Sequence, residues 1–335
     1  MSDTGISSIA NYIPRLRLQR KAITESNAWM APNLVGKGKG TKAISNWDED
    51  SVTMSVEAAR RVLGPEDDRS QVNSLFFAST TMPYSDRLNS GIIRAALTLE
   101  ETTQCSDVSS SLKSGTTALI NAFNSVNSGK SSLSLVAASD KRKARVASAQ
   151  ELNFGDAATA ISISKDNVIA KFIDSASLSI DFIDHFRGPN EEFDYNWEER
   201  WIRDEGYLKI IPKLINNLLK DNNISPSDIS RFILPCIFPR VPQTIAKKTG
   251  IDPDNVVDNL AASVGDTGSC HPLLMLTSVL ENSTPGEKIL ICSFGGGGDA
   301  ILLETTNLIT DFTNTETTVD LIDNGYRDPV RWRLP

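Results

Sequence analysis

A run of small polar residues, "DVSSSLKSGTTAL" (107–119), stands where a short strand is expected to turn into a helix. Enzymes often place a nucleophile at such a bend, so the serines at 109–111 are the first candidates for chemistry. A serine hydroxyl needs a neighbouring base at neutral pH, and the chain contains only two histidines, His185 and His271. We therefore interpret the serines as residues that allow tight packing and cap the following helix.

The four cysteines lie far apart, without a CxxC pair, which indicates reduced thiols rather than a disulfide framework. Cys105 lies on the predicted strand before the bend, and we expect it to be a buried structural thiol. Cys270 and His271, taken with Cys236, match no common ligand spacing, so we predict no metal site.

The overall composition is that of a globular protein, with 335 residues, 40% of them apolar and 23% charged. The net charge of −8 argues against nucleic acid or an anionic membrane as the main partner. No apolar run approaches the length of a membrane span, and the first residues lack the basic and apolar regions of a signal peptide. Together with the reduced thiols, this predicts a cytoplasmic protein.

Apolar strand patterns alternate with helical patterns along the chain, which predicts βαβ units and a largely parallel sheet covered by helices. The expected strands lie at 73–80, 103–109, 132–139, 155–164, 231–235, 288–294 and 298–305. The expected helices lie at 48–63, 87–100, 112–128, 206–223, near 240–250 and near 270–282. Pro212 is expected to tighten or kink the start of the fourth of these helices.

The second half of the chain repeats the order of the first. The triplet Gly-Asp-Ala opens the last strand of each half, at 155–157 and again at 298–300, which indicates a duplicated α/β fold. We expect the active site where strand-end loops of both halves converge. The predicted parts are an N-terminal half at 1–165, a C-terminal half at 166–309 with an irregular excursion at 184–206, and a surface-wrapping or partner-contacting extension at 310–335.

Five motifs occur in an order that resembles the thiolase superfamily, specifically its ketoacyl-synthase-III and hydroxymethylglutaryl-CoA-synthase branch. They are "YIPRLRL" (12–18), "NWDEDSVTMSVEAAR" (46–60), "NFGDAAT" (153–159), "VGDTGS" (264–269) and "SFGGGGDA" (293–300). The resemblance implies an α/β thiolase fold, with duplicated βαβαβαββ halves in a five-layered αβαβα arrangement. It also implies a homodimer built through the central sheets, and glycines of "SFGGGGDA" that form the floor of the active site.

Active members of this branch use a Cys-His-Asn set in which the cysteine takes an acyl group from a thioester. Matching motif to motif, Leu112 stands in the position of the cysteine, Cys236 in that of the histidine and Asp266 in that of the asparagine. Thr80 stands in the position of the acid that hydroxymethylglutaryl-CoA synthases carry before "Pro-Tyr". Because all four positions depart from the pattern, the resemblance implies that the usual condensation cannot run by the usual route.

The motifs "KSGTTAL" and "VGDTGS" with the later "PLL" also resemble the cysteine-lacking, synthase-like subunits of thiolase and OB-fold acyltransferase complexes, of the diacetylphloroglucinol type. This implies a non-catalytic subunit that supports a partner thiolase, together with a zinc-ribbon/OB-fold (DUF35-type) protein. No covalent cofactor is implied, and a coenzyme A thioester is the ligand to expect.

Two alternatives stay open. A stand-alone acyl-CoA decarboxylase, hydrolase or retro-Claisen enzyme could use Asp266, Cys236 or His271 without an acyl-cysteine, although Asp266 equally suits a carboxylate that accepts N–H bonds from its own turn. The loop "VGKGKGTK" (35–42) lacks the spacing of a phosphate loop. Its lysines, Lys37, Lys39 and Lys42, either contact the phosphates of coenzyme A or belong to a solvated loop.

Overall fold

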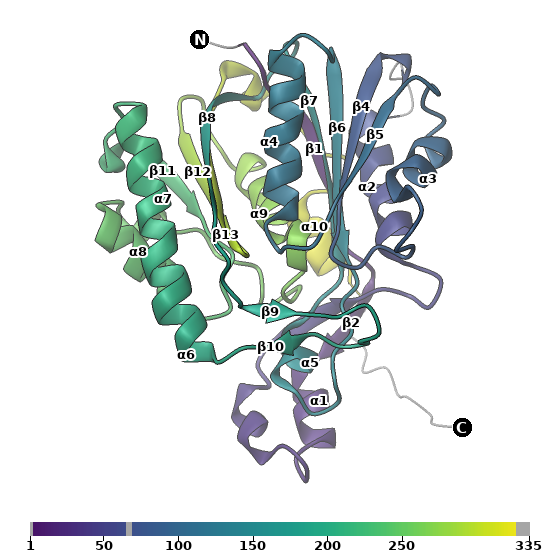
Figure 1. Cartoon of the computed structure of the whole chain (residues 1–335), viewed down its shortest axis with the longest axis vertical. Coiled ribbons are helices and arrows are strands. Elements are labelled where there is room, and N and C mark those ends of the chain that lie inside the picture. Colours follow the sequence, from purple (N-terminus) through teal and green to yellow (C-terminus); the bar gives the residue numbers. More distant parts are fainter. Residues whose placement is uncertain (1–2, 65–68, 326–335) are drawn as a thin grey trace.

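A mixed β-sheet of nine strands runs through the protein (Figure 1). The computed structural model describes residues 3–64 and 69–325. The strands follow one another across the sheet in the order β11-β12-β13-β8-β1-β7-β6-β4-β5. Their bounds are β1 Gly5–Tyr12, β4 Val72–Ala78, β5 Gln104–Val108, β6 Leu133–Asp140, β7 Ala157–Ser164, β8 Ala170–Ser179, β11 Ile229–Ile233, β12 Lys288–Phe294 and β13 Gly297–Thr305.

Helices pack on this sheet in three layers, so that the arrangement is αβαβα, as expected (Figure 1). The helices α2 and α3 cover one outer face, α7 and α8 cover the other, and α4 packs against α9 between the two halves of the sheet. The bounds of these helices are α2 Ser51–Leu63, α3 Asn89–Ala96, α4 Ser114–Asn127, α7 Leu208–Asp221, α8 Val241–Thr249 and α9 His271–Leu280.

The two halves repeat the same pairing pattern. In the first half β4 runs parallel to β5 and β6 while β6 pairs with β7 antiparallel, and in the second β11 runs parallel to β12 while β12 pairs with β13 antiparallel. The repeat is incomplete, because the segment at 255–263 forms only an isolated bridge, between Val256 and Phe232, in the place of a third parallel strand.

The strands β1 and β8, which the sequence pattern did not identify, join the halves at the centre of the sheet. They meet through only two residue pairs, Gly5 with Lys171 and Ile6 with Ala170. A Cβ on Gly5 would lie 2.3 Å from the carbonyl oxygen of Ala170, so only glycine allows this approach. Beyond this contact the strands diverge, and the divergence makes room for α4 and α9.

Local sequence explains where the long outer helices begin. Asp50 caps α2 by accepting from the N–H of Thr53, whose hydroxyl in turn accepts from the N–H of Asp50. Helix α6 (Glu199–Trp201) and a π-helical turn (Ile202–Tyr207) lead directly into α7. Pro212 has no N–H to give to the carbonyl of Leu208, and Lys248 Nζ donates to that carbonyl instead, at 2.8 Å.

Smaller elements lie between the main ones. The irregular excursion contains a two-stranded hairpin of β9 and β10, followed by α6. A second short ribbon pairs β2 with β3 near the N-terminus. The bounds are β2 Leu16–Gln19, α1 Arg20–Ser26, β3 Thr41–Ile44, α5 Ala149–Asn153, β9 His185–Phe186, β10 Tyr195–Asn196 and α10 Thr318–Asp323.

The C-terminal extension packs on its own chain as far as it is described. Helix α10 buries Leu321 in the central core, and Arg17 donates to the carbonyl oxygen of Leu321 at 2.7 Å. The hydroxyl of Thr318 accepts from Asn11 Nδ2 at 3.0 Å. Up to residue 325 the extension thus packs on its own chain, and the rest of the predicted extension lies outside the described residues. Within 3–64 and 69–325, the helices are too short or too polar to span a lipid bilayer.

Candidate functional site

Loops from both halves of the chain meet at Leu112. This residue lies two positions before α4, Cys236 follows β11, and Asp266 precedes α9. All three line one small cavity of about 50 Å³, together with His271 and Tyr207, and we name it the cysteine cavity. The fold thus brings Leu112 close to Cys236, which lies more than 120 residues later in the sequence, and Cys236 close to Asp266, which lies 30 residues further on.

The glycine-rich loop before β13 lies directly against this turn. Ser111 Oγ donates to the carbonyl oxygen of Gly295 at 2.7 Å, and a Cβ on Gly295 would lie 3.0 Å from the backbone nitrogen of Leu112. Glycine is needed here because backbone approaches backbone. Lys113 forms a salt bridge of 2.9 Å with the fully buried Asp299 of the second Gly-Asp-Ala triplet.

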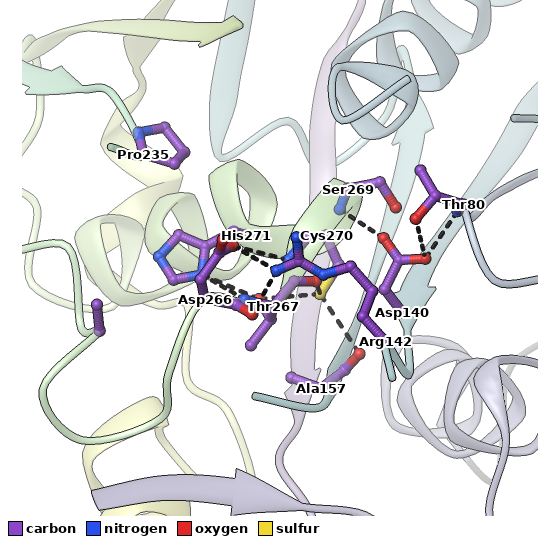
Figure 2. A network of polar contacts seen from close by, with 12 residues as sticks. Thr80, Asp140, Arg142, Ala157, Pro235, Asp266, Thr267, Ser269, Cys270 and His271 are labelled. Atoms are coloured by element: carbon purple, nitrogen blue, oxygen red, sulfur yellow. Dashed lines mark hydrogen bonds and ion pairs between the residues drawn. The ribbon is translucent and has the colours of Figure 1, made fainter. Parts of the chain in front are cut away.

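Asp266 is held by internal partners. Its Oδ1 lies 2.9 Å from Arg142 Nη2 and accepts from the N–H of Gly268 at 3.0 Å, and Arg142 also donates to the carbonyl oxygen of Asp266 (Figure 2). Burial alone would raise the pKa of Asp266, but the charge of Arg142, and then the hydrogen bonds from Arg142 and from the N–H of Gly268, hold it below its usual value. The carboxylate is therefore ionised and a weak base.

Arg142 is a site residue that sequence reasoning missed. Its side chain is only 3% exposed, and its guanidinium lies 3.8 Å from the centre of the Phe154 ring. The available signal was the basic run "DKRKAR" directly after the strand at 132–139, whose carboxyl end points to the site.

His271 makes hydrogen bonds with both ring nitrogens. Its Nδ1 accepts from the N–H of Thr267 at 3.0 Å, and its Nε2 lies 2.7 Å from the carbonyl oxygen of Asn259, to which it donates in the corresponding tautomer (Figure 2). Burial lowers the pKa of His271, so the ring is neutral. Both nitrogens are occupied, and neither can take a proton from a substrate without breaking a buried hydrogen bond.

The thiols around the site are inert. Burial raises the pKa of Cys236 to about 12 and that of Cys270 to about 12. Cys270 Sγ lies 3.4 Å from the carbonyl oxygen of Ala157 and 3.2 Å from Thr267 Oγ1 (Figure 2). Cys105 is partly buried, and burial raises its pKa too. In the described ranges, no group of three or more His, Cys, Asp or Glu side chains could hold a metal ion.

Thr80 lies on the other side of Leu112, in a larger cavity of about 310 Å³ that we name the serine cavity. Asp140, which is fully buried, accepts from the N–H of Thr80 at 2.7 Å and from its hydroxyl at 3.0 Å (Figure 2). The second oxygen of Asp140 accepts from the N–H of Ser269 at 2.7 Å. Asp140 therefore ties the Thr80 loop to the start of α9.

The excursion forms one wall of the serine cavity. The cavity is lined by Thr80, Ser109, Ser110, Ser111, Leu112, Phe182, Asp184, His185, Phe186, Arg187, Asp194, Gly295 and Gly296. His185 Nδ1 lies 2.8 Å from Asp184 Oδ2, and Arg187 bonds to both Asp194 and the carbonyl oxygen of Thr80. Sequence reasoning placed His185 in an irregular segment and gave it no position relative to the site, because a hairpin of two-residue strands leaves no periodic signal.

The three lysines do not behave alike. Lys42 is buried and donates to the carbonyl oxygen of Glu151, and burial lowers its pKa. Its amino group is therefore used within the fold, and contact of Lys42 with the phosphates of coenzyme A stays a prediction. Lys37 and Lys39 are exposed and are absent from the walls of the cysteine and serine cavities.

Comparisons with known proteins agree with this architecture. Residues 219–303 match the family model of the 3-oxoacyl-[acyl-carrier-protein] synthase III C terminal. The chain is 28% identical to the hydroxymethylglutaryl-CoA synthase of Picrophilus torridus over 316 residues, which cover 92% of this chain and 89% of that protein. It is 27% identical to the same enzyme of Aeropyrum pernix, over 92% of this chain and 87% of that protein.

Solved structures give the same result. A hydroxymethylglutaryl-CoA synthase complexed with CoA superposes with a TM-score of 0.81 at 19% identity, over 96% of this chain and 87% of that one. A variant of OleA from Xanthomonas campestris superposes with a TM-score of 0.79 at 15% identity, over 91% of this chain and 98% of that one. The chain therefore has the same fold as these solved synthases, and its residues 219–303 resemble the C-terminal part of 3-oxoacyl-[acyl-carrier-protein] synthase III.

Proposed function

We propose that this protein is a catalytically degenerate, synthase-like subunit that supports a partner thiolase in forming or cleaving carbon–carbon bonds of acyl-CoA thioesters. The observation that carries the proposal is Leu112. It stands at the turn into α4 and lines the cavity that also contains Cys236 and Asp266. A nucleophile at this position would be activated by the dipole of α4, but the leucine side chain has no nucleophilic atom.

The polar residues of the cysteine cavity support the same conclusion. The thiol of Cys236 has a pKa of about 12, Asp266 is paired with Arg142, and His271 has both nitrogens bonded. Each group thus serves the fold. This arrangement gives little support to the alternative of a stand-alone acyl-CoA enzyme that uses these three residues.

Coenzyme A enters the proposal as the carrier of the thioester, since a similar synthase was solved in complex with CoA. Exposed Lys37 and Lys39 are the remaining lysines of the 35–42 loop that could meet its phosphates. A zinc-ribbon/OB-fold protein completes the proposed assembly by bridging the two larger subunits. A cytoplasmic location fits the four free cysteines.

We further propose a homodimer. Strand β5 ends the sheet, so one of its edges has no partner within the described chain, and a second copy could extend the sheet there. Light scattering on the purified chain should give twice the mass of 36.5 kDa. A monomer at micromolar concentration would contradict the dimer, without bearing on the loss of catalysis.

The proposed function is tested by co-expression with a thiolase and a zinc-ribbon/OB-fold protein from one operon. We expect the three to co-purify, and acyl transfer measured as CoA release should disappear when the cysteine of the thiolase is changed to alanine. The isolated chain should show no condensation. Activity of the isolated chain that is lost in Asp266→Ala or Cys236→Ala would instead establish the stand-alone enzyme.

A restoration experiment sharpens the test. Leu112→Cys should give no condensation, because the positions of the histidine and asparagine are also altered. Formation of a condensation product by Leu112→Cys alone would show that a single substitution separates this chain from an active synthase, and the proposed loss of the whole catalytic set would be wrong.

A further inference from the structure

The serine cavity contains polar groups that the fold does not use. Ser109 and Ser110 are exposed, and within residues 3–64 and 69–325 their hydroxyls make no hydrogen bond. Ser111 differs, because its Oγ donates to Gly295 and accepts from the N–H of Lys113 at 3.2 Å. The packing and capping role expected for the three serines is thus carried by Ser111 alone.

Ser110 also has a backbone conformation that serine rarely adopts. Its φ is +72°, in the left-handed region that favours glycine. The residue lies on the turn between the end of β5 and the start of α4, and such strain tends to persist where a function requires it. The strand–turn–helix context is that of a nucleophile elbow, although the flanking glycines of that motif are absent here.

A base oriented by a carboxylate lies in the wall of the same cavity. His185 Nδ1 is 2.8 Å from Asp184 Oδ2, so the carboxylate fixes the tautomer with a proton on Nδ1. His185 Nε2 then carries the lone pair, and no hydrogen-bond partner for it occurs among the described residues. Burial would lower the pKa of His185, but the hydrogen bond and charge of Asp184, and the charge of Asp194, raise it overall.

The other charged groups of the cavity are already paired. Arg187 and Asp194 form a salt bridge of 2.5 Å, and Arg187 also donates to the carbonyl oxygen of Thr80. Neither group competes with His185 for a serine hydroxyl. The cavity of about 310 Å³ is of the size that accommodates a small acyl ester.

We propose that Ser110, His185 and Asp184 form a second, cysteine-independent acyl-transfer site that cleaves activated esters or thioesters of short acyl groups. This inference is independent of the proposed function, since it uses none of the residues of the cysteine cavity. Leu112 lines both cavities.

The reaction balances with water as the only co-substrate. The Ser110 oxygen attacks the acyl carbon while His185 Nε2 takes the hydroxyl proton. The bond from the acyl carbon to the leaving oxygen or sulfur breaks, and the leaving group departs with that proton. Water then attacks the acyl-serine with His185 again as the base, releasing the acid and restoring the serine. The first turn of α4 follows the serines, and its dipole has the sign that stabilises the oxyanion.

Fluorophosphonate labelling tests this site on the full-length chain. Diisopropyl fluorophosphate should give one adduct by intact mass, and peptide mapping should place it on Ser110. Ser110→Gly should abolish the adduct, and this variant keeps the fold because glycine suits a φ of +72°. His185→Gln should slow labelling at least about tenfold, since a general base typically contributes a factor of about 100 or more.

Matched variants and a substrate complete the experiment. Ser128→Gly, at the far end of α4, should label like the parent chain. Hydrolysis of p-nitrophenyl acetate should show a burst equal to the enzyme concentration and should be lost in Ser110→Gly. An adduct on Ser109, labelling that survives Ser110→Gly, or no adduct on the folded parent chain would each overturn the proposal.

Discussion

The cysteine cavity and the serine cavity lie on two sides of the same leucine, and they differ in how their polar groups are used. In the cysteine cavity the carboxylate of Asp266 is paired with Arg142, and both ring nitrogens of His271 are hydrogen-bonded, to Thr267 and Asn259. In the serine cavity, Ser110 and His185 line the wall, and the Ser110 hydroxyl and His185 Nε2 have no hydrogen-bond partner among the described residues. Buried polar groups that are fully paired stabilise the fold, whereas unpaired ones are available to a ligand.

The comparison shows that a side chain at a position matched to a family motif is not necessarily available for reaction. The sequence motifs predict functional positions at Cys236 and Asp266, yet burial of the thiol and pairing of the carboxylate with Arg142 use both groups within the fold. His185 was not among the predicted site residues, yet Asp184 orients it, and its Nε2 has no hydrogen-bond partner within the described residues. Four measurements can break or sharpen this contrast.

The largest expected effect concerns the reactivity of Cys236. Raising the pKa of a thiol from 9.0 to about 12 lowers its thiolate fraction about 1000-fold. Iodoacetamide at pH 7.5 should therefore alkylate Cys236 about 1000-fold more slowly in the folded chain than in urea, measured by peptide mass spectrometry. Alkylation at equal rates would mean that the cysteine cavity contains a reactive thiol after all.

The next effect concerns the buried ion pair. Arg142→Ala leaves the carboxylate of Asp266 without its counter-charge, and it should lower the free energy of unfolding by about 3 kcal/mol in urea titrations. Its sequence neighbour serves as the control. Lys143→Ala breaks an exposed pair with Glu192, which has side chains 68% and 58% exposed, and should change stability by less than about 1 kcal/mol. If the two substitutions lower the free energy of unfolding equally, the buried pair contributes no more to stability than the exposed pair.

The pH dependence of stability follows from the lowered pKa of Asp266. A carboxylate with a lower pKa in the folded state stabilises the protein above its unfolded pKa of about 3.9, and this contribution disappears as the pH falls through the folded value. Asp266→Asn should be less stable than the parent chain at pH 7, and the difference should shrink below about pH 4. If the difference in the free energy of unfolding stays constant across this pH range, then protonation of Asp266 is not linked to folding through its pairing with Arg142.

The smallest effect is a gain in stability. Ser110→Gly removes the strain of a serine in the left-handed region, while the larger unfolded-state entropy of glycine opposes folding. The net effect should be a stabilisation of up to about 1 kcal/mol. Ser128→Gly is the matched control, since Ser128 has a φ of −72° and glycine there should destabilise by about 0.5–1 kcal/mol. If thermal unfolding shows both variants to be destabilised, the strain inferred at Ser110 is absent.

Much of the fold could be predicted from the sequence. The strand predicted at 288–294 coincides with β12, and the helix predicted at 112–128 overlaps α4 within two residues at the start. Strands β1 and β8 were not identified from the sequence. In β8, partly exposed polar residues occur along most of its length, so its alternating apolar pattern is weak. The excursion was predicted to be irregular, and its role as a cavity wall depends on contacts that no local pattern encodes.

The sequence by itself determined the alternating elements, the duplication and the leucine at the turn into α4, since these depend on periodicity and on residue order. Only the tertiary structure decided which groups are free. Pairing Asp266 with Arg142 joins residues 124 positions apart, and only the folded hairpin places His185 in the wall of the cavity that the serines also line. Burial and hydrogen bonding depend on such distant contacts, and they decide whether a polar side chain stabilises the fold or remains available for chemistry.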